Sequence, residues 1–129
     1  MAESIPPQVQ NQLVRFQEMQ EQYKAILVRK QQFEIDSKEV DRALQESKAL
    51  ADDATIYKSV GVLLFKTDKT KIVTELTDKK EELDLRLKTV EKQEQRLKVA
   101  LEELRRTIMS QVSGAPGASG AGVSPPSGS

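Results

Sequence analysis

The chain has 129 residues, enough for one domain, and it is 31% charged but only 4% aromatic, which leaves few side chains for a compact core. Its 20 basic and 20 acidic residues balance, which argues against a nucleic-acid or anionic membrane surface driven by net charge. It contains no Cys and no His, so neither a disulfide framework nor thiol chemistry is expected, and the lack of Cys is compatible with a reducing cytoplasm.

The first long segment, from about Pro6 to about Ala51, carries a seven-residue apolar repeat and has no Gly or Pro after its first turn. A repeat of this period lets two helices bury a continuous seam, so a long helix is predicted here. The a positions are Val9, Phe16, Tyr23, Lys30, Ser37, Leu44 and Ala51, and the d positions are Gln12, Met19, Ile26, Phe33, Val40, Ser47 and Ala54.

A short segment rich in β-branched and aromatic residues, 55–67, follows this helix. Gly61 and Val62 divide it into two predicted strands, at about 55–60 and 63–67, and a Gly-X pair fits a two-residue type II′ turn in which Gly takes the position with positive φ. An isolated hairpin is at best marginally stable in water, so we expect this one to join the hairpins of other subunits in a shared sheet or barrel. The alternative is that it folds back onto its own coiled coil.

A second long segment, about 70–112, repeats the heptad, with Asp68 or Thr70 as the predicted helix cap. The sequence therefore predicts a mainly α fold: a long antiparallel two-helix coiled coil with one β-hairpin between the helices, the hairpin joining an oligomeric β-barrel. The alternative is a pair of surface helices on an ordinary bundle. The a positions are Val73, Lys80, Leu87, Glu94, Leu101 and Ile108, and the d positions are Leu76, Leu83, Val90, Leu97, Leu104 and Gln111.

Three seam positions hold the charged residues Lys30, Lys80 and Glu94. With the turn midway along the chain, residues that face each other should have numbers summing to about 120 to 123, which brings Lys80 within reach of Asp41 or Asp36. Such charges either pair and fix the register of the coil, or lie with their stems along the seam and their heads in water.

Helices of about 45 residues would be roughly 65 to 70 Å long, so both chain termini should lie together, far from the hairpin. Apolar residues continue to that end, and several of them, including Leu13 and Met109, fall beside the seam and should stay partly exposed, as is typical of an interaction site. The alternative is that these residues only pack against each other and hold the two helices together at this end of the coil. These residues are Ile5, Val9, Leu13 and Phe16 from the first helix, and Leu101, Leu104, Ile108, Met109 and Val112 from the second.

The sequence offers no group suited to catalysis: no nucleophile has a base, carboxylates fall in Glu/Lys runs typical of solvated helix faces, and no phosphate loop or metal-ligand spacing occurs. We therefore expect neither an enzyme nor a cofactor, and no nucleic-acid groove. No signal peptide and no apolar run approaching about 18 residues is found, so a soluble, unexported protein is expected. Residues 113–129 are rich in Gly, Ser, Ala and Pro and are predicted to be a disordered tail.

Three stretches resemble the β subunits of the prefoldin family, most closely the archaeal form, over about Ile5 to Val112: IPPQVQNQLVRFQEMQEQYKAI, YKSVGVLLFKTDKTKIVTEL and LDLRLKTVEKQEQRLKVALEEL. The most specific part is Tyr57, Lys58, Val60 and Gly61 followed by Leu63, Phe65 and Lys66, because a coiled coil alone matches many unrelated proteins. A single hairpin fits the β type, since α subunits of the family carry two. Val62 departs from the family, in which the turn position after Gly is often polar.

The resemblance implies an α2β4 hexamer made with prefoldin α subunits, whose hairpins form a double barrel from which six coiled coils extend. It implies an ATP-independent cytoplasmic chaperone that holds non-native proteins at the tips of the coils and passes them to a group II chaperonin. The alternative is a structural coiled-coil adaptor that links folded partners. The resemblance places client binding at Val9, Leu13, Phe16, Leu104, Ile108 and Met109, chaperonin docking at Arg105, Arg106 and Ile108, and assembly at Ile56, Tyr57, Val60, Gly61, Leu63, Leu64 and Phe65.

Overall fold

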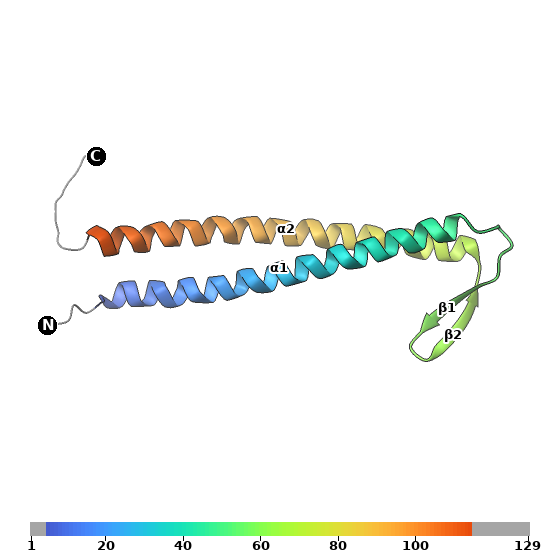
Figure 1. Ribbon diagram of the computed structural model, residues 1–129, viewed down its shortest axis with the longest axis horizontal. Coiled ribbons are helices and arrows are strands. Elements are labelled where there is room, and N and C mark those ends of the chain that lie inside the picture. The colour runs from blue at the N-terminus through green and yellow to red at the C-terminus, as the bar shows by residue number, and fades with distance from the viewer. Residues whose placement is uncertain (1–4, 115–129) are drawn as a thin grey trace. The chain divides into compact units, whose positions relative to one another are not determined.

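The computed structural model describes residues 5–114 and contains four elements (Figure 1). In chain order these are helix α1 (Pro7–Lys48), strand β1 (Ile56–Val60), strand β2 (Leu63–Thr67) and helix α2 (Lys69–Gly114). Two long helices with one antiparallel hairpin between them confirm the predicted fold class. Helix α2 runs two residues beyond its predicted end and so includes Ser113 and Gly114, the first two residues of the predicted tail. The rest of that tail, 115–129, lies outside the described residues.

The chain divides into two units. Of the described residues, the terminal unit consists of 5–27 and 92–114, and the central unit of 28–91. In the terminal unit, the first part of α1 runs antiparallel to the last part of α2, so α1 begins where α2 ends (Figure 1). In the central unit, the end of α1 and the start of α2 pack together and the hairpin connects them.

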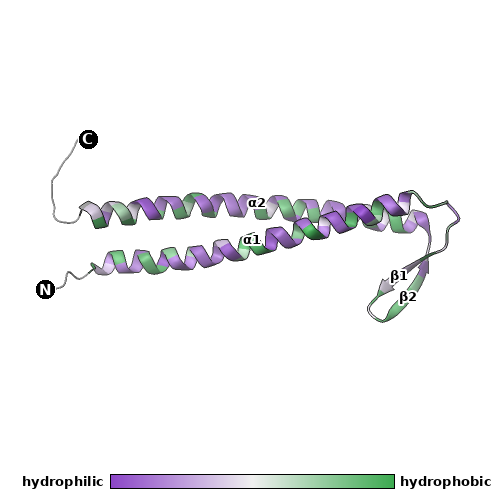
Figure 2. Cartoon of the chain, viewed as in Figure 1, coloured by the Kyte–Doolittle hydropathy of each residue, from purple (hydrophilic) through white to green (hydrophobic). Residues whose placement is uncertain are grey.

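A seam of heptad residues forms the core of each unit. Every predicted a and d position from Val9 to Ser47 and from Val73 to Gln111 is buried or half-buried, which confirms the heptad assignment. Figure 2 shows the corresponding alternation of hydrophobic and hydrophilic residues along both helices. The most deeply buried side chains among the described residues are Val9 and Ile108 in the terminal unit, and Ser37, Leu44, Leu83 and Val90 in the central unit.

Helix α1 ends at Lys48, about three residues before its predicted end. The N–H of Leu50 donates to the carbonyl of Ser47 over 3.2 Å, a bond of the tighter i,i+3 kind that often closes a helix. The carbonyl of Leu50 then accepts a hydrogen bond from the ammonium of Lys69 over 2.8 Å. A lysine from the start of α2 therefore satisfies a backbone carbonyl two residues beyond the end of α1.

The hairpin closes through a two-residue turn, as predicted. Val60 pairs with Leu63, which leaves Gly61 and Val62 as the central residues of the turn. Gly61 has a φ of +59°, the positive value that a type II′ turn requires at its first central position. Strand β1 begins one residue later than predicted, at Ile56.

Asp68 is the cap of helix α2. Its carboxylate oxygen Oδ1 accepts a hydrogen bond from the backbone N–H of Lys71 over 2.9 Å, which is the usual bond from an N-cap side chain to the third helical residue. Of the two predicted caps, Asp68 and Thr70, the structure selects the first. The hairpin therefore passes into α2 with a single residue between them.

Candidate functional site

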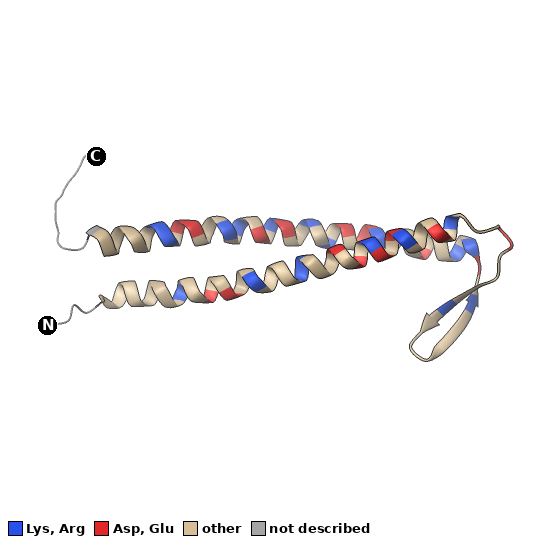
Figure 3. Ribbon diagram, viewed as in Figure 1, with Lys and Arg blue, Asp and Glu red and all other residues tan. Residues whose placement is uncertain are grey.

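The described residues at the end of the terminal unit include no charged side chain. The segments 5–14 and 107–114 contain no charged side chain, although 31% of the whole chain is charged. We call these two segments together the charge-free end, and Figure 3 shows it as the uncoloured start of α1 and end of α2. Four large apolar side chains are exposed here: Ile5, Val14, Met109 and Val112. An exposed apolar surface without charges is typical of an interaction site.

The predicted client-binding residues occupy three different environments. Met109 is 57% exposed, whereas Leu13, Phe16 and Leu104 are half-buried. Val9 and Ile108 are only 4% and 8% exposed, because both occupy a positions of the seam. The six residues thus lie in one unit, but two of them are covered by the packing of the coil itself.

Two glutamine side chains interrupt the apolar seam of the charge-free end. Gln12 and Gln111 occupy d positions, one turn from Val9 and Ile108 respectively. Their Oε1 atoms are buried without a hydrogen-bond partner. No other buried side-chain nitrogen or oxygen in the part of the chain that the structure describes lacks one. A buried acceptor left unsatisfied costs about 1–3 kcal/mol, so the closed seam is weaker here than its apolar residues alone would make it.

A shallow groove of about 280 Å³ lies between the helices of the terminal unit, next to the charge-free end. Its apolar lining comes from Phe16, Tyr23 and Leu101. Arg105 lies at its rim and donates to Glu102 over 3.0 and 2.5 Å. These hydrogen bonds, together with the charge of Arg105, lower the pKa of the Glu102 carboxyl.

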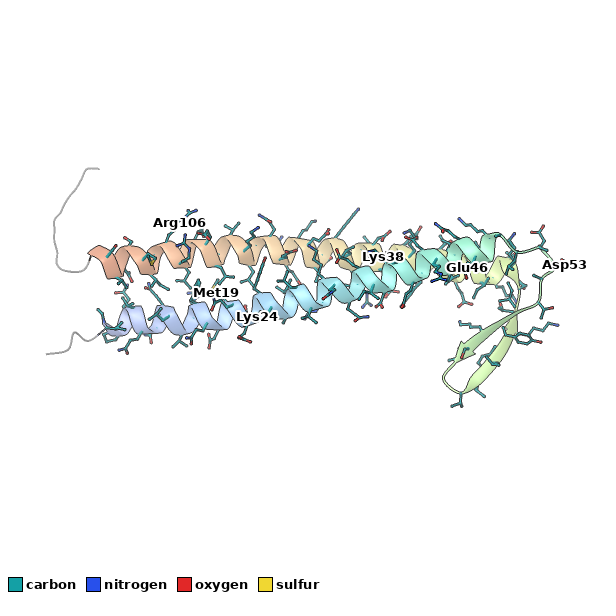
Figure 4. All side chains as sticks on the ribbon, in the orientation of Figure 1. Met19, Lys24, Lys38, Glu46, Asp53 and Arg106 are labelled. Atoms are coloured by element: carbon teal, nitrogen blue, oxygen red, sulfur yellow. The ribbon has the colours of Figure 1, made fainter. Side chains whose placement is uncertain are left out.

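The two arginines predicted to dock a chaperonin differ in their surroundings. Both are exposed, but Arg105 is bound by Glu102 one turn earlier in α2. In Figure 4, Arg106 extends from the side of α2 away from α1, and Met19 lies on the side of α1 that faces α2. Ile108, the third predicted docking residue, is buried.

The hairpin is a second candidate surface, in the central unit. Val60, Leu63 and Phe65 lie on one face of the hairpin, and Tyr57 and Leu64 lie on the other, because paired residues share a face and successive residues alternate. All five are exposed, and Val62 in the turn is 99% exposed. Ile56, at the base of the hairpin, is half-buried.

The base of the hairpin is tied to helix α2. The ammonium of Lys58 contacts the carboxylate of Glu75, and both residues line a groove that also includes Ile72 and Leu76. In the described chain the sheet has two strands and therefore two unpaired edges, which are available to strands of other chains.

Lys80 is paired in the seam of the central unit. Its ammonium lies 2.6 Å from a carboxylate oxygen of Asp41, on the facing helix. The hydrogen bond to Asp41, with the charges of Asp41 and Asp84, raises the pKa of Lys80. Of the two interpretations of a charged seam residue, cross-coil pairing therefore applies to Lys80. Lys30 and Glu94 are half-buried at their own seam positions.

Three features were not found from the sequence. Two of them belong to the charge-free end: the exposed side chain of Val14, and the buried oxygens of Gln12 and Gln111 that have no hydrogen-bond partner. The only sequence signal for this end was the absence of charged residues from both of its segments. The bond from Lys69 to Leu50 joins residues 19 positions apart and has no sequence signature.

Within residues 5–114, neither a cluster of potential metal ligands nor a membrane-spanning helix is found. No group of three or more potential metal ligands occurs in residues 5–114. Neither α1 nor α2, as far as it is described, includes a stretch with the length and apolarity needed to cross a bilayer.

A pair of long helices with one inserted hairpin is the architecture of a coiled-coil subunit. Comparison with known proteins shows which family of such subunits the chain belongs to. The family model described as prefoldin subunit matches residues 10–115. The chain belongs to the prefoldin family, which is a family of chaperone subunits. Membership implies assembly with other prefoldin subunits.

Several relatives are named prefoldin subunit beta. One from Saccharolobus islandicus is 45% identical over 113 residues, which cover 88% of this chain and 90% of the relative. One from Methanosarcina acetivorans is 42% identical over 108 residues, 84% of this chain and 92% of the relative. The crystal structure of the prefoldin beta subunit from Thermococcus strain KS-1 matches with a TM-score of 0.78 and 40% identity, over 90% of this chain and all of that one. The chain is therefore similar to β subunits, as its sequence indicated.

Proposed function

We propose that the chain is a β-type subunit of an ATP-independent holdase, which captures non-native proteins at the charge-free end. The observation that carries this proposal is the pairing of exposed apolar side chains with a complete lack of charge at that end. An unfolded chain exposes apolar groups. Burying them against this surface does not remove water from any charged side chain of the charge-free end, so the free-energy cost of desolvating a charge is avoided.

Assembly through the hairpin supports the same proposal. A hairpin with apolar residues on both faces needs partners on both sides, and hairpins of other subunits supply them without leaving free edges. We place this subunit in an α2β4 hexamer with α-type partners. Several weak apolar contacts on separate coils then combine into avidity toward one client.

Delivery of the client to a group II chaperonin in the cytoplasm completes the proposal. Arg106 is the better placed of the two arginines for this step, because both are exposed but the guanidinium of Arg105 is bound by Glu102. Docking at Arg106 would leave the apolar side chains of the charge-free end in contact with the client. The absence of a nucleophile–base pair in the sequence fits a role without catalysis.

The client-binding role is tested by replacing Met109 and Val112 with Ser in the full chain assembled with its α-type partner. Both side chains are more than half exposed, at 57% and 58%, so the change removes apolar surface without opening the seam. Truncating an apolar contact at an interface costs about 1 kcal/mol, so the two changes together cost about 2 kcal/mol, and the double variant should need about thirtyfold more protein to halve aggregation of a denatured client. Light scattering of the client measures this.

Val28 and Leu85 provide the matched control, because they are similarly exposed apolar residues of the central unit, at 67% and 66%. Changing both to Ser should leave protection intact. Equal loss of protection in the two double variants would show that general surface hydrophobicity, and not the charge-free end, binds the client. Adding a group II chaperonin and ATP to the wild-type assay should convert protection into refolding.

A further inference from the structure

We propose that the ion pair between Lys58 and Glu75 is a latch that sets the angle between the hairpin and the start of α2, and that the hairpin has a second position in which Lys58 binds Asp78. The pair joins strand β1 to helix α2. The inference rests on the proposed assembly through the hairpin and extends it. In an assembled subunit the hairpin belongs to the shared body, so the latch controls the direction in which the coil leaves that body.

The half-buried side chains of the hairpin all lie on one face, at its base. Ile56, Lys58 and Thr67 are half-buried, whereas Tyr57 and Lys66 beside them are exposed. The first three share a face, because residues 56 and 67 are paired and successive residues alternate between faces. The contact of Lys58 with α2 shows that this is the face next to the helix. Packing of the hairpin on the coil is therefore limited to its base, where the latch lies.

The covalent connections at this junction permit a change of angle. On one side, β2 passes into α2 through Asp68 alone. On the other side, residues 49–55 join α1 to β1 without helix or strand. In this link the carbonyl of Leu50 and the carboxylate of Asp52 bind the ammonium of Lys69, over 2.8 and 3.4 Å, which anchors the link to α2 and not to the hairpin. The hairpin can therefore pivot at Asp68 while the ends of the two helices stay joined.

The latch is strong enough to bias this angle and weak enough to release it. The side chains of Lys58 and Glu75 are 42% and 47% exposed, and ion pairs at such exposure shift an equilibrium by about 1.5- to fivefold. Lys79 lies four residues after Glu75 in the same groove, so it offers this carboxylate a partner within the helix when Lys58 leaves. Salt screens an exposed pair, so high ionic strength should release the latch.

Asp78 supplies the second position of the latch. It lies about one turn beyond Glu75, lines the same groove of about 450 Å³, and makes no ion pair with another described residue. Three residues of helix advance about 4.5 Å. Lys58 pairs with Phe65, so it lies about three residues of strand, or about 10 Å, from Asp68. A move of about 4.5 Å at this distance from the pivot turns the hairpin by about 25°.

The test measures the distance between spin labels at Val62→Cys in the turn and Lys88→Cys on α2. Both positions are exposed, and the chain has no other Cys. Pulsed electron paramagnetic resonance gives the distance distribution of the full chain, alone and in the α-type assembly with labelled copies diluted among unlabelled ones. The wild type should show a main and a minor distance. Lys58→Met should lower the share of the main distance about 1.5- to fivefold, and Asp78→Asn should remove the minor distance.

Lys66→Met is the matched control. Lys66 lies on the other face of the same hairpin, is exposed, and makes no ion pair with another described residue, so its loss should leave the distribution unchanged. Exchange of the two charges, Lys58→Glu with Glu75→Lys, should restore the main distance because the pair forms again with opposite polarity. Salt at about 1 M should broaden the distribution of the wild type and leave that of Lys58→Met unaltered.

The effect on the assembly is read from clients of two sizes. Because the angle of each coil sets the spread of the client-binding ends, Lys58→Met should change the ratio of protection between a large and a small denatured client by up to about fivefold. The mass of the assembly should stay the same. An unchanged ratio would show that the latch does not control the spread of the coils.

The remaining outcomes separate this inference from the proposed function. Equal distance distributions for Lys58→Met and Lys66→Met would overturn the latch, and so would a charge exchange that fails to restore the main distance. A minor distance that survives Asp78→Asn would refute the second position. If the chain does not assemble with its α-type partner, the proposed function is wrong, while the distances in the free chain still decide whether the latch exists.

Discussion

Lys80 occupies a seam position that an apolar residue would usually fill. A charge there weakens the apolar seam, but its pairing with Asp41 exists only when the two helices are aligned so that these residues face each other. A shift by one heptad would leave Lys80 in the seam without this partner. The pair is therefore suited to fixing the register of the central unit at some expense of stability.

Replacing Lys80 with Leu should raise the thermal stability of the chain, followed by circular dichroism, because an apolar residue then fills the seam. The variant should also respond less to alkaline pH. Since folding raises the pKa of Lys80, the stabilisation from its charged form is complete below the ordinary lysine pKa of about 10.4 and is lost as the pH rises through the higher folded value.

Lys88→Leu is the control for this comparison, because Lys88 is exposed on the same helix. It should show the same alkaline loss as the wild type. An identical pH profile for Lys80→Leu and Lys88→Leu would mean that the pair with Asp41 adds nothing to stability.

For single residues, the sequence predicted the heptad position better than the burial or the pairing of the side chain. The heptad pattern placed Lys80 and Val9 in the seam correctly, because a and d positions follow from the period alone. It could not decide whether Lys80 pairs, since its long side chain reaches either a carboxylate or water. It also could not show that Val9 and Ile108 are covered while Met109 is exposed, because all three are simply apolar residues near one end.

Among the elements, the hairpin depends most on one residue. Gly61 has a φ of +59°, and a Cβ added to it would meet no atom within 4 Å. A substitution there is therefore opposed by the backbone conformation and not by crowding. For residues other than Gly this conformation costs about 1–2 kcal/mol, and Asn tolerates it better than most.

Gly61→Val should therefore impair pairing of β1 with β2 and prevent stable assembly with α-type subunits, whereas Gly61→Asn should assemble nearly as the wild type does. Light scattering coupled to size exclusion measures the assembled fraction. Full assembly of the Val variant would contradict a role for this hairpin in joining subunits.

The elements themselves were largely predictable, and their ends were less so. Two runs of heptads, with one β-rich segment between them that Gly61 divides into two strands, predict the order helix, hairpin, helix from the sequence alone. The end of α1 was predicted about three residues too late: the helix ends at Lys48, and the residues that follow include Leu50, whose carbonyl is bound by Lys69 from the start of the next helix. Contacts of this kind are set by the folded chain and leave no local pattern.

For the whole molecule, the number of subunits distinguishes the proposed holdase from a coiled-coil adaptor. Mixed with an α-type partner, this chain should give a hetero-hexamer by native mass measurement, because its hairpin offers two apolar faces and two free edges. An adaptor should instead form a dimer or tetramer without that partner. A stable homo-oligomer that ignores the α-type chain would favour the adaptor.

The hairpin has a consequence for the life of a newly made subunit. Before assembly, it displays on both faces the kind of apolar surface that the charge-free end is proposed to capture. An orphan copy is therefore both a chaperone arm and a candidate client, including for other copies of itself. We expect cells that contain this chain to keep its supply matched to that of its partners, since every surplus copy would occupy arms needed for other proteins.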